Sequence, residues 1–226
     1  ALIGIIGAVN AFALFASSYI FGRESDVHNH EVFIKIGLGT SVIAFLLQVL
    51  SDPTFFVPIL ANPWLLAFSR FLAGFTAGIS PAALTAYVYE SHQSLGRFSA
   101  YGSLGSGLGN LVAGLLALTG TIVVGLISLY SGVFIISSMC FLLAFVISLP
   151  LSSKNNTHLQ VPLFPKTLMR KNWYVYTSFF FRHFGANAIW VIYPLFILSV
   201  GGNDFWIGVI YFINAFSQFI IMQFLG

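Results

Sequence analysis

Residues 69–90 read SRFLAGFTAGISPAALTAYVYE, and this stretch decides the fold. It is an apolar segment of helical length that contains one basic residue and ends on a carboxylate, Glu90. Four of its positions follow each other in steps of four, four and three residues, so they share one face of a helix. These positions are Arg70, Gly74, Gly78 and Pro81. Because glycine has no side chain, another backbone or a ligand can approach this face closely.

The arginine in this helix is expected to have a function. A guanidinium group inside a lipid-spanning segment costs about 3 kcal/mol or more unless it faces protein or a water-filled cavity. We therefore expect Arg70 to point into the protein. The alternative is that its long side chain extends to the membrane interface.

The composition of the 226 residues is that of a membrane protein. Hydrophobic residues make up 58% and charged residues only 7%, whereas a soluble domain has about 25% charged residues. The apolar runs are continuous and do not alternate as the strands of outer-membrane barrels do. The predicted fold class is all-α, a polytopic membrane helical bundle in a lipid bilayer. The single cysteine, Cys140, excludes a disulfide framework within the chain.

Seven apolar runs are long enough to cross a hydrocarbon core of about 30 Å. They lie near 1–22, 32–51, 61–89, 98–118, 122–150, 172–199 and 205–225. All six lysines and arginines outside these runs fall in the loops on one side of the membrane. These loops are 23–31, 90–97 and 151–171. The positive-inside rule makes them cytoplasmic, and we expect a multi-pass protein of the plasma membrane. The same rule explains the net charge of +3, so no nucleic-acid partner is expected.

The two ends of the chain resemble each other. When the sequence is shifted by 204 residues, eight of the 22 overlapping positions are identical, including Asn10-Ala11-Phe12 against Asn214-Ala215-Phe216. The repeat relates the first span to the seventh, and such parallel repeats of six spans are typical of transporters built from two halves. We therefore expect an N-terminal half in 1–150, a cytoplasmic linker in 151–171 and the start of a C-terminal half in 172–226.

Several local patterns resemble the major facilitator superfamily. Gly22 and Asp26 match the glycine and aspartate of the loop that follows the family's second span, and 70–78 matches the Arg-x-x-x-Gly pattern of its fourth span. Its fifth span carries closely spaced glycines. Here these are Gly102, Gly105, Gly109 and Gly114, with Asn110 where drug antiporters place a proline. The resemblance implies two pseudo-symmetric six-helix halves, both incomplete here, in a fragment that runs from the second to the eighth span.

The resemblance also implies roles for residues at the cytoplasmic ends and in the helix contacts. In the family, charged groups at the cytoplasmic ends of the helices form an ion-pair latch. The corresponding latch residues here are Gly22, Asp26, Glu90 and Arg97. The alternative for them is ordinary solvated charge at the interface. Two Gly-x-x-x-Gly pairs let helices approach each other and are expected in helix packing. They are Gly74 with Gly78 and Gly105 with Gly109.

A second set of residues is expected at a central cavity, which the fourth and seventh spans line in the family. The set consists of Arg70, Arg182, His183, Asn187 and Trp190. The apolar runs contain no Asp or Glu away from their ends. Two arginines without a carboxylate partner favour an organic or phosphorylated anion as substrate, held by a bidentate clamp. Packing or interfacial roles for Arg182 and His183 stay open.

The predicted function is secondary active transport of a small solute by alternating access. A drug or multidrug efflux antiporter of the same superfamily is the main alternative, and a membrane-embedded enzyme or a channel is less well supported. The sequence contains no recognisable catalytic or Walker motif. We expect no enzymatic activity, no cofactor and no metal, and read His28, His30 and His92 as solvated loop residues. A coupling proton or other ion is left open.

Overall fold

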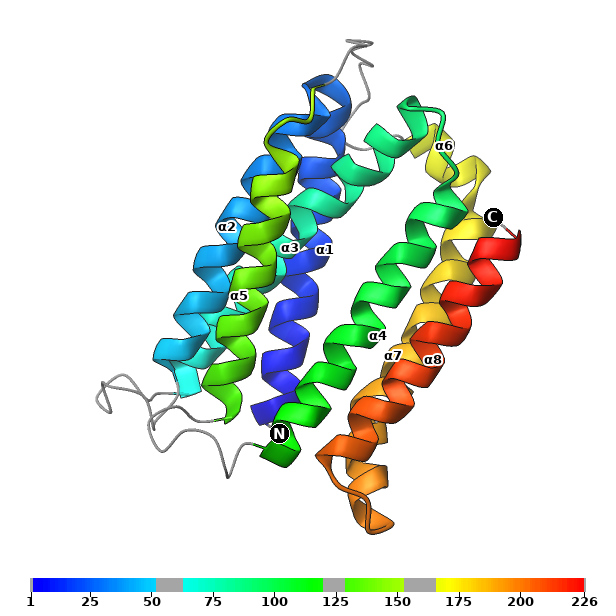
Figure 1. Ribbon diagram of the computed structural model, residues 1–226. Helices are drawn as coiled ribbons and strands as arrows, with labels where there is room; N and C mark the ends of the chain where they lie inside the picture. The colour runs from blue at the N-terminus through cyan, green and yellow to red at the C-terminus, as the bar shows by residue number, and fades with distance from the viewer. Residues whose placement is uncertain (1, 52–62, 120–128, 153–165, 226) are drawn as a thin grey trace. The chain divides into compact units, whose positions relative to one another are not determined.

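A computed structural model describes residues 2–51, 63–119, 129–152 and 166–225 (Figure 1). The described residues contain helices and no strands, so the predicted all-α class is confirmed. The helices are α1 (Leu2–Val27), α2 (His30–Leu50), α3 (Pro63–Glu90), α4 (Leu95–Thr119), α5 (Leu129–Ser148), α6 (Lys166–Lys171), α7 (Trp173–Ser199) and α8 (Asp204–Leu225). Each long helix coincides with one predicted apolar run. The short helix α6 lies in the predicted linker.

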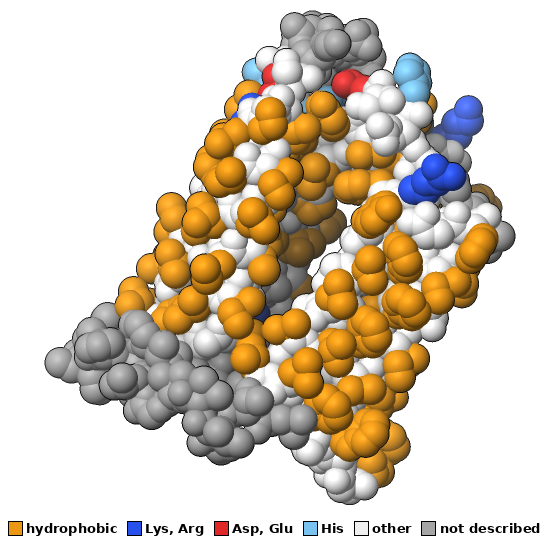
Figure 2. Space-filling model, in the orientation of Figure 1, with side chains coloured by type: hydrophobic (Ala, Val, Ile, Leu, Met, Phe, Trp, Pro, Cys, Tyr) orange, Lys and Arg blue, Asp and Glu red, His pale blue; other side chains and the backbone are white. Residues whose placement is uncertain are grey.

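Five of the described helices are long and apolar enough to cross a membrane; they are α1, α2, α3, α5 and α8. Large hydrophobic side chains on these helices are exposed, among them Phe12, Phe15 and Phe224. Figure 2 shows hydrophobic side chains over the visible faces of the long helices. Apolar side chains that face outward in this way are stable in a hydrocarbon environment and would be unfavourable in water.

The chain divides into two compact units. The first unit contains α1, α2, α3 and α5, and α3 packs against both α1 and α2. Its small buried core is formed by Ile34, Leu38 and Ala83. α2 and α3 approach closely where Gly37 lies against Ser80, since a Cβ atom built on Gly37 would be 2.8 Å from the Ser80 nitrogen.

The small face of α3 is covered by α1. A Cβ atom on Gly74 would collide with the carbonyl oxygen of Asn10, and one on Gly78 would lie 2.6 Å from the carbonyl oxygen of Leu14. Across the same contact the Ser18 hydroxyl donates to the carbonyl oxygen of Gly78 at 3.1 Å. The backbone of α1 therefore occupies the space that the two glycines leave free.

The second unit contains most of α4 together with α6, α7 and α8. The turn between α7 and α8 follows from its sequence. Gly201 has φ +85°, and the amides of Gly201 and Gly202 donate to the carbonyls of Leu198 and Ile197 at 3.2 and 2.9 Å. This is the Schellman arrangement that ends helices at glycine. Asn203 then caps α8 by accepting a hydrogen bond from the Trp206 amide at 3.2 Å.

The grouping of α4 differs from the division expected from sequence. Residues 99–119 join 162–226 in the second compact unit, whereas the sequence-based division places all of 1–150 in one half. The contacts made by glycines of α4 account for this grouping, as described below. The division into two transporter halves stays a prediction.

Candidate functional site

Glycines hold α4 and α8 close together within the second unit. A Cβ atom built on Gly107 would lie 3.0 Å from the Cβ atom of Ala215, and one on Gly208 would lie 2.9 Å from the Cα atom of Gly114. The contacts on each helix are seven residues apart, two helical turns, so they fall on one line along the interface. These pairs bring the two backbones into direct contact.

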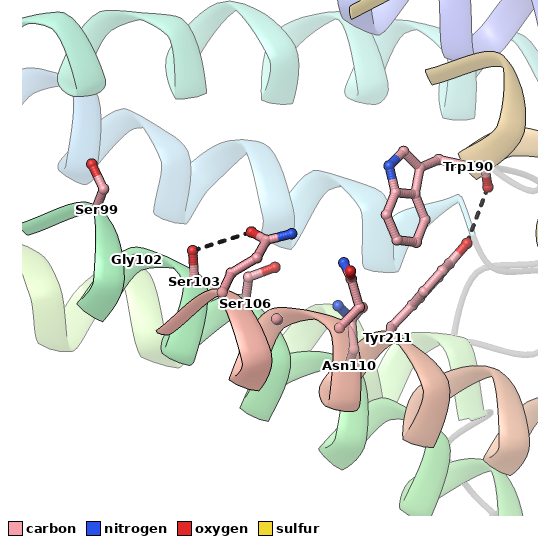
Figure 3. A pocket seen from close by; sticks show the side chains of 10 residues that line it. Ser99, Gly102, Ser103, Ser106, Asn110, Trp190 and Tyr211 are labelled. Carbon is pink, nitrogen blue, oxygen red and sulfur yellow. Dashed lines mark hydrogen bonds between the residues drawn. The ribbon is translucent and has the colours of Figure 1, made fainter. Parts of the chain in front are cut away.

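A pocket of about 540 Å³ opens beside this contact. One face of α4 supplies Ser99, Gly102, Ser103, Ser106 and Asn110; α7 supplies Trp190; and α8 supplies Tyr211, Asn214, Ala215 and Gln218 (Figure 3). The positions on α4 recur every three or four residues, which explains why one helix face presents all of them. Seven of the ten lining residues carry an amide or hydroxyl group, and none of the ten carries a charge at neutral pH.

Two contacts order the side chains of the pocket. The Ser103 hydroxyl lies 3.5 Å from the Oε1 atom of Gln218, which joins α4 to α8. At the other end the Tyr211 hydroxyl donates to the main-chain carbonyl of Trp190 at 3.0 Å, and their rings meet edge to face with centroids 4.9 Å apart.

The hydrogen bond from Tyr211 has a cause in the sequence. Pro194 lies inside α7, four residues after Trp190. Proline has no amide hydrogen, so it cannot make the helical bond to the carbonyl of the residue four positions earlier. The Tyr211 hydroxyl supplies a donor to this freed carbonyl, and α7 is thereby fixed to α8.

The structure brings only one residue of the predicted cavity set to this pocket, namely Trp190. Arg182 and His183 are exposed on α7, and Nδ1 of His183 lies at hydrogen-bonding distance, 3.0 Å, from the Phe179 carbonyl. The side chain of Asn187 lies outside the described residues. Arg70 belongs to the first unit.

Arg70 is half-buried in α3 and pairs with an aromatic ring. Its guanidinium carbon lies 5.5 Å from the ring centroid of Phe134 on α5. Within the described parts of the chain it forms no ion pair with a carboxylate. A cation–π contact of this kind contributes about 0.5–2 kcal/mol. It leaves the donors of the guanidinium group free to bind an oxygen ligand.

The C-terminal ends of α1 and α3 and the N-terminal end of α2 carry a charged cluster. Nε2 of His30 lies 3.0 Å from Oε1 of Glu90, and the side chains are 7% and 28% exposed. Asp26 interacts electrostatically with both residues. Gly22 lies nearby along α1 and against Ala82, with 3.3 Å between a built Cβ atom and the Ala82 side chain. Two of the predicted latch carboxylates are thus brought together.

Other residues of the predicted latch and packing sets lie elsewhere. Arg97 is exposed in the first turn of α4, where its amide donates to the Ser94 hydroxyl at 3.2 Å, and no ion pair to it occurs among the described residues. Cβ atoms built on Gly105 and Gly109 meet nothing within 4 Å in the part of the chain that the structure describes. Gly107 and Gly114 make the close contacts of α4 instead.

Sequence reasoning also misjudged one histidine. His30 was expected in a solvated loop, but it is the first residue of α2 and is buried against Glu90. That prediction was wrong for His30, because the helix begins inside the predicted loop. His28 and His92 are exposed, as expected. The described residues contain no group of His, Cys, Asp or Glu arranged to hold a metal ion.

The sequence analysis missed most residues of the pocket. Asn110 was noted only as a departure from the antiporter pattern, and Tyr211, Ser103 and Gln218 were not singled out. Asn214 appeared in the internal repeat. A usable signal was present in α4, where serine and asparagine recur on one face of a helix that is otherwise rich in glycine and leucine.

Comparison with known proteins identifies the family. The model of the Major Facilitator Superfamily matches residues 1–226, the full length of the chain. No curated protein and no solved structure matches it. The chain therefore belongs to the major facilitator superfamily, a family of membrane transporters.

Proposed function

We propose that this protein is a secondary active transporter that moves a small polar solute by alternating access. The observation that carries this proposal is the pocket of α4, α7 and α8, a group of amide and hydroxyl side chains inside an otherwise apolar helical bundle. Polar groups at membrane depth are unfavourable unless they are hydrogen-bonded or face a water-filled cavity. A pocket that keeps several of them accessible is explained if they bind a solute.

The size and position of the pocket fit this role. Its volume of about 540 Å³ lies within the range of roughly 300–1,000 Å³ of small-molecule sites. α7 and α8 fall in the predicted C-terminal half. Transporters of two repeated halves place their solute sites near the middle of the membrane and expose them to each side in turn.

The charged cluster at the cytoplasmic ends supports a latch that acts during this cycle. Asp26, His30 and Glu90 come from three different helix ends, so the electrostatic interactions of His30 with the two carboxylates depend on how those ends are packed. We infer that the cluster stabilises one of the two access states. Asp26→Asn should then reduce the rate of transport while the protein still inserts. Unchanged uptake in proteoliposomes would refute the latch.

Accessibility labelling tests the proposed mechanism directly. In a Cys140→Ser background, Ser106→Cys places a thiol in the pocket, and a membrane-impermeant maleimide is applied from either face of oriented vesicles. Alternating access predicts labelling from both faces, with transported solute shifting the ratio. Ser91→Cys, at the cytoplasmic end of α3, should react from one face only. Labelling of Ser106→Cys from a single face, unaffected by any transported solute, would overturn the proposal.

An organic anion is a second candidate for the solute, and Arg70 favours it. Its guanidinium group is half-buried, contacts Phe134 and has no carboxylate partner among the described residues. A bidentate contact to a carboxylate or phosphate would satisfy it. This reading predicts that Arg70→Ala and Arg182→Ala abolish uptake of anions. A protein that exports organic cations and tolerates both changes would instead be the drug antiporter.

A further inference from the structure

We propose that the pocket of α4, α7 and α8 selects an uncharged solute rich in hydroxyl groups, with the ring size of a hexose. The proposal rests on the proposed transport function and specifies the substrate class of that same pocket. It is carried by three properties of the lining: the lack of charge, the mixture of donors and acceptors, and the aromatic end formed by Trp190 and Tyr211.

The lack of charge in the lining disfavours an ionic solute. All ten lining residues are neutral at ordinary pH. An ion that leaves water for a site lined by neutral groups loses part of its hydration, and it needs a counter-charge or a metal to replace it. The pocket supplies dipoles only. A neutral solute loses less hydration free energy, and amide and hydroxyl groups can replace its hydrogen bonds one for one.

The kind of polar group in the pocket fits hydroxyls. Each Asn and Gln offers two donors and an acceptor, and each serine offers one donor and accepts as well. A solute hydroxyl also donates and accepts. Asn110 and Asn214 make no side-chain hydrogen bond that is described within the structure, so their amides are available to a solute. Ser103 and Gln218 are only weakly joined, at 3.5 Å.

The aromatic end supplies the apolar contact that a sugar ring needs. Trp190 is 39% exposed and forms the end of the pocket together with Tyr211 (Figure 3). Aromatic side chains combine a large apolar face with a polar edge. The carbon–hydrogen face of a pyranose can lie on such a surface while its hydroxyls point toward the amides. The pocket would thereby distinguish a ring from an open-chain polyol.

The freed carbonyl of Trp190 adds a strong acceptor at this end. This carbonyl receives no helical hydrogen bond, because Pro194 has no amide hydrogen, and it accepts one from the Tyr211 hydroxyl at 3.0 Å instead. A solute hydroxyl near this end can share that carbonyl or bind the Tyr211 oxygen. Removal of the Tyr211 hydroxyl should therefore weaken solute binding beyond its effect on folding.

Three probes with the same ring test the proposal. Uptake of D-glucose, D-glucuronate and protonated D-glucosamine is measured with the full-length protein in proteoliposomes. We expect D-glucose to be preferred over both ions by about tenfold or more, because an ion loses hydration at a site that offers it no counter-charge. Preference for D-glucuronate would overturn the proposal in favour of the arginine-based anion site.

An isosteric charge insertion separates pocket effects from general ones. Asn214→Asp places a carboxylate in the lining and should reduce D-glucose uptake while raising the relative uptake of protonated D-glucosamine. Asn203→Asp is the matched control, since Asn203 caps α8 outside the pocket and aspartate is an equally good cap. Equal effects of the two variants, or no change in charge preference, would refute the proposal.

Failure of this proposal differs from failure of the proposed function. If none of the three probes is transported but Ser106→Cys still reacts from both faces, the hydroxylated substrate class is wrong and alternating access stands. If Ser106→Cys reacts from one face only and no probe is transported, both are wrong.

Discussion

Tyr211→Phe removes one oxygen atom from the protein and tests how α7 tolerates its internal proline. The Tyr211 hydroxyl donates at 3.0 Å to the Trp190 carbonyl, which Pro194 has deprived of its helical partner. Phenylalanine keeps the ring and its edge-to-face contact with Trp190 at 4.9 Å. The change therefore removes the hydrogen bond and little else.

The expected size follows from the environment of that carbonyl. A hydrogen bond within a protein contributes about 1 kcal/mol net, and measured side-chain bonds between membrane helices average roughly 0.6 kcal/mol. The Trp190 carbonyl borders an open pocket, so water can partly replace the lost donor. We expect Tyr211→Phe to lower the free energy of unfolding by about 0.6–1 kcal/mol. This is at or below the low end of the roughly 1–3 kcal/mol that a buried acceptor without a partner costs.

A double-mutant cycle isolates this contact. Pro194→Ala restores an amide hydrogen at residue 194, which can bond the Trp190 carbonyl within α7. In that background Tyr211→Phe should cost almost nothing, which gives an interaction free energy of about 0.6–1 kcal/mol. Unfolding is followed by denaturant titration in detergent micelles, with Tyr193→Phe as the matched control. If the effects of Tyr211→Phe and Pro194→Ala are additive, the freed carbonyl does not explain the contact.

Three further predictions concern packing and charge. Gly208→Ala should destabilise the protein by about 1–3 kcal/mol through overpacking against α4. Gly105→Ala lies in open space and should stabilise the protein by roughly 0.5–1 kcal/mol. If thermal unfolding shows that both substitutions change stability in the same direction, the glycine contacts are contradicted. Glu90→Gln should slow transport by weakening the contact with His30, and Glu90→Asp should recover it in part; equal rates for both in proteoliposome uptake argue against a latch. If Arg70 binds solute, Arg70→Met should abolish anion uptake and Arg70→Lys should keep part of it. If the variants instead fail to fold, as judged by size-exclusion chromatography, Arg70 has a structural role.

Helix positions could be predicted well from the sequence because the membrane constrains them strongly. Every backbone polar group in hydrocarbon must be paired within its own helix, so an apolar run of about 20 residues has few alternatives. The expected run near 172–199 and the helix α7 (Trp173–Ser199) agree to within a residue at the start. The turn after α7 also follows from the sequence, because Gly201 and Gly202 suit a helix end and Asn203 suits a helix start.

Side-chain partners were less predictable, because each depends on the rotation of a helix about its axis. In α4 the glycines of the Gly-x-x-x-Gly pair face open space among the described residues, while Gly107 and Gly114 contact α8. All four glycines lie within three helical turns. Because α4 carries small residues on two faces, their spacing alone does not show which face contacts α8. His30 was misjudged for a related reason, since a shift of two residues in the start of α2 moves it from a loop to a buried helix end.

The repeated Asn-Ala-Phe segment shows how one sequence pattern serves two purposes. In α1 the Asn10 side chain lies against Gly74, 2.9 Å from a Cβ atom built on that glycine. Further along α1, the Ser18 hydroxyl donates to the Gly78 carbonyl. In α8 the matching Asn214 lines the pocket, while Ala215 makes the close contact with α4. Asn10 and Ser18 are thus engaged in helix packing within the first unit, whereas Asn214 lines the pocket of the second. This difference, which follows from helix rotation and not from residue type, is the reason to look for the solute in the second unit.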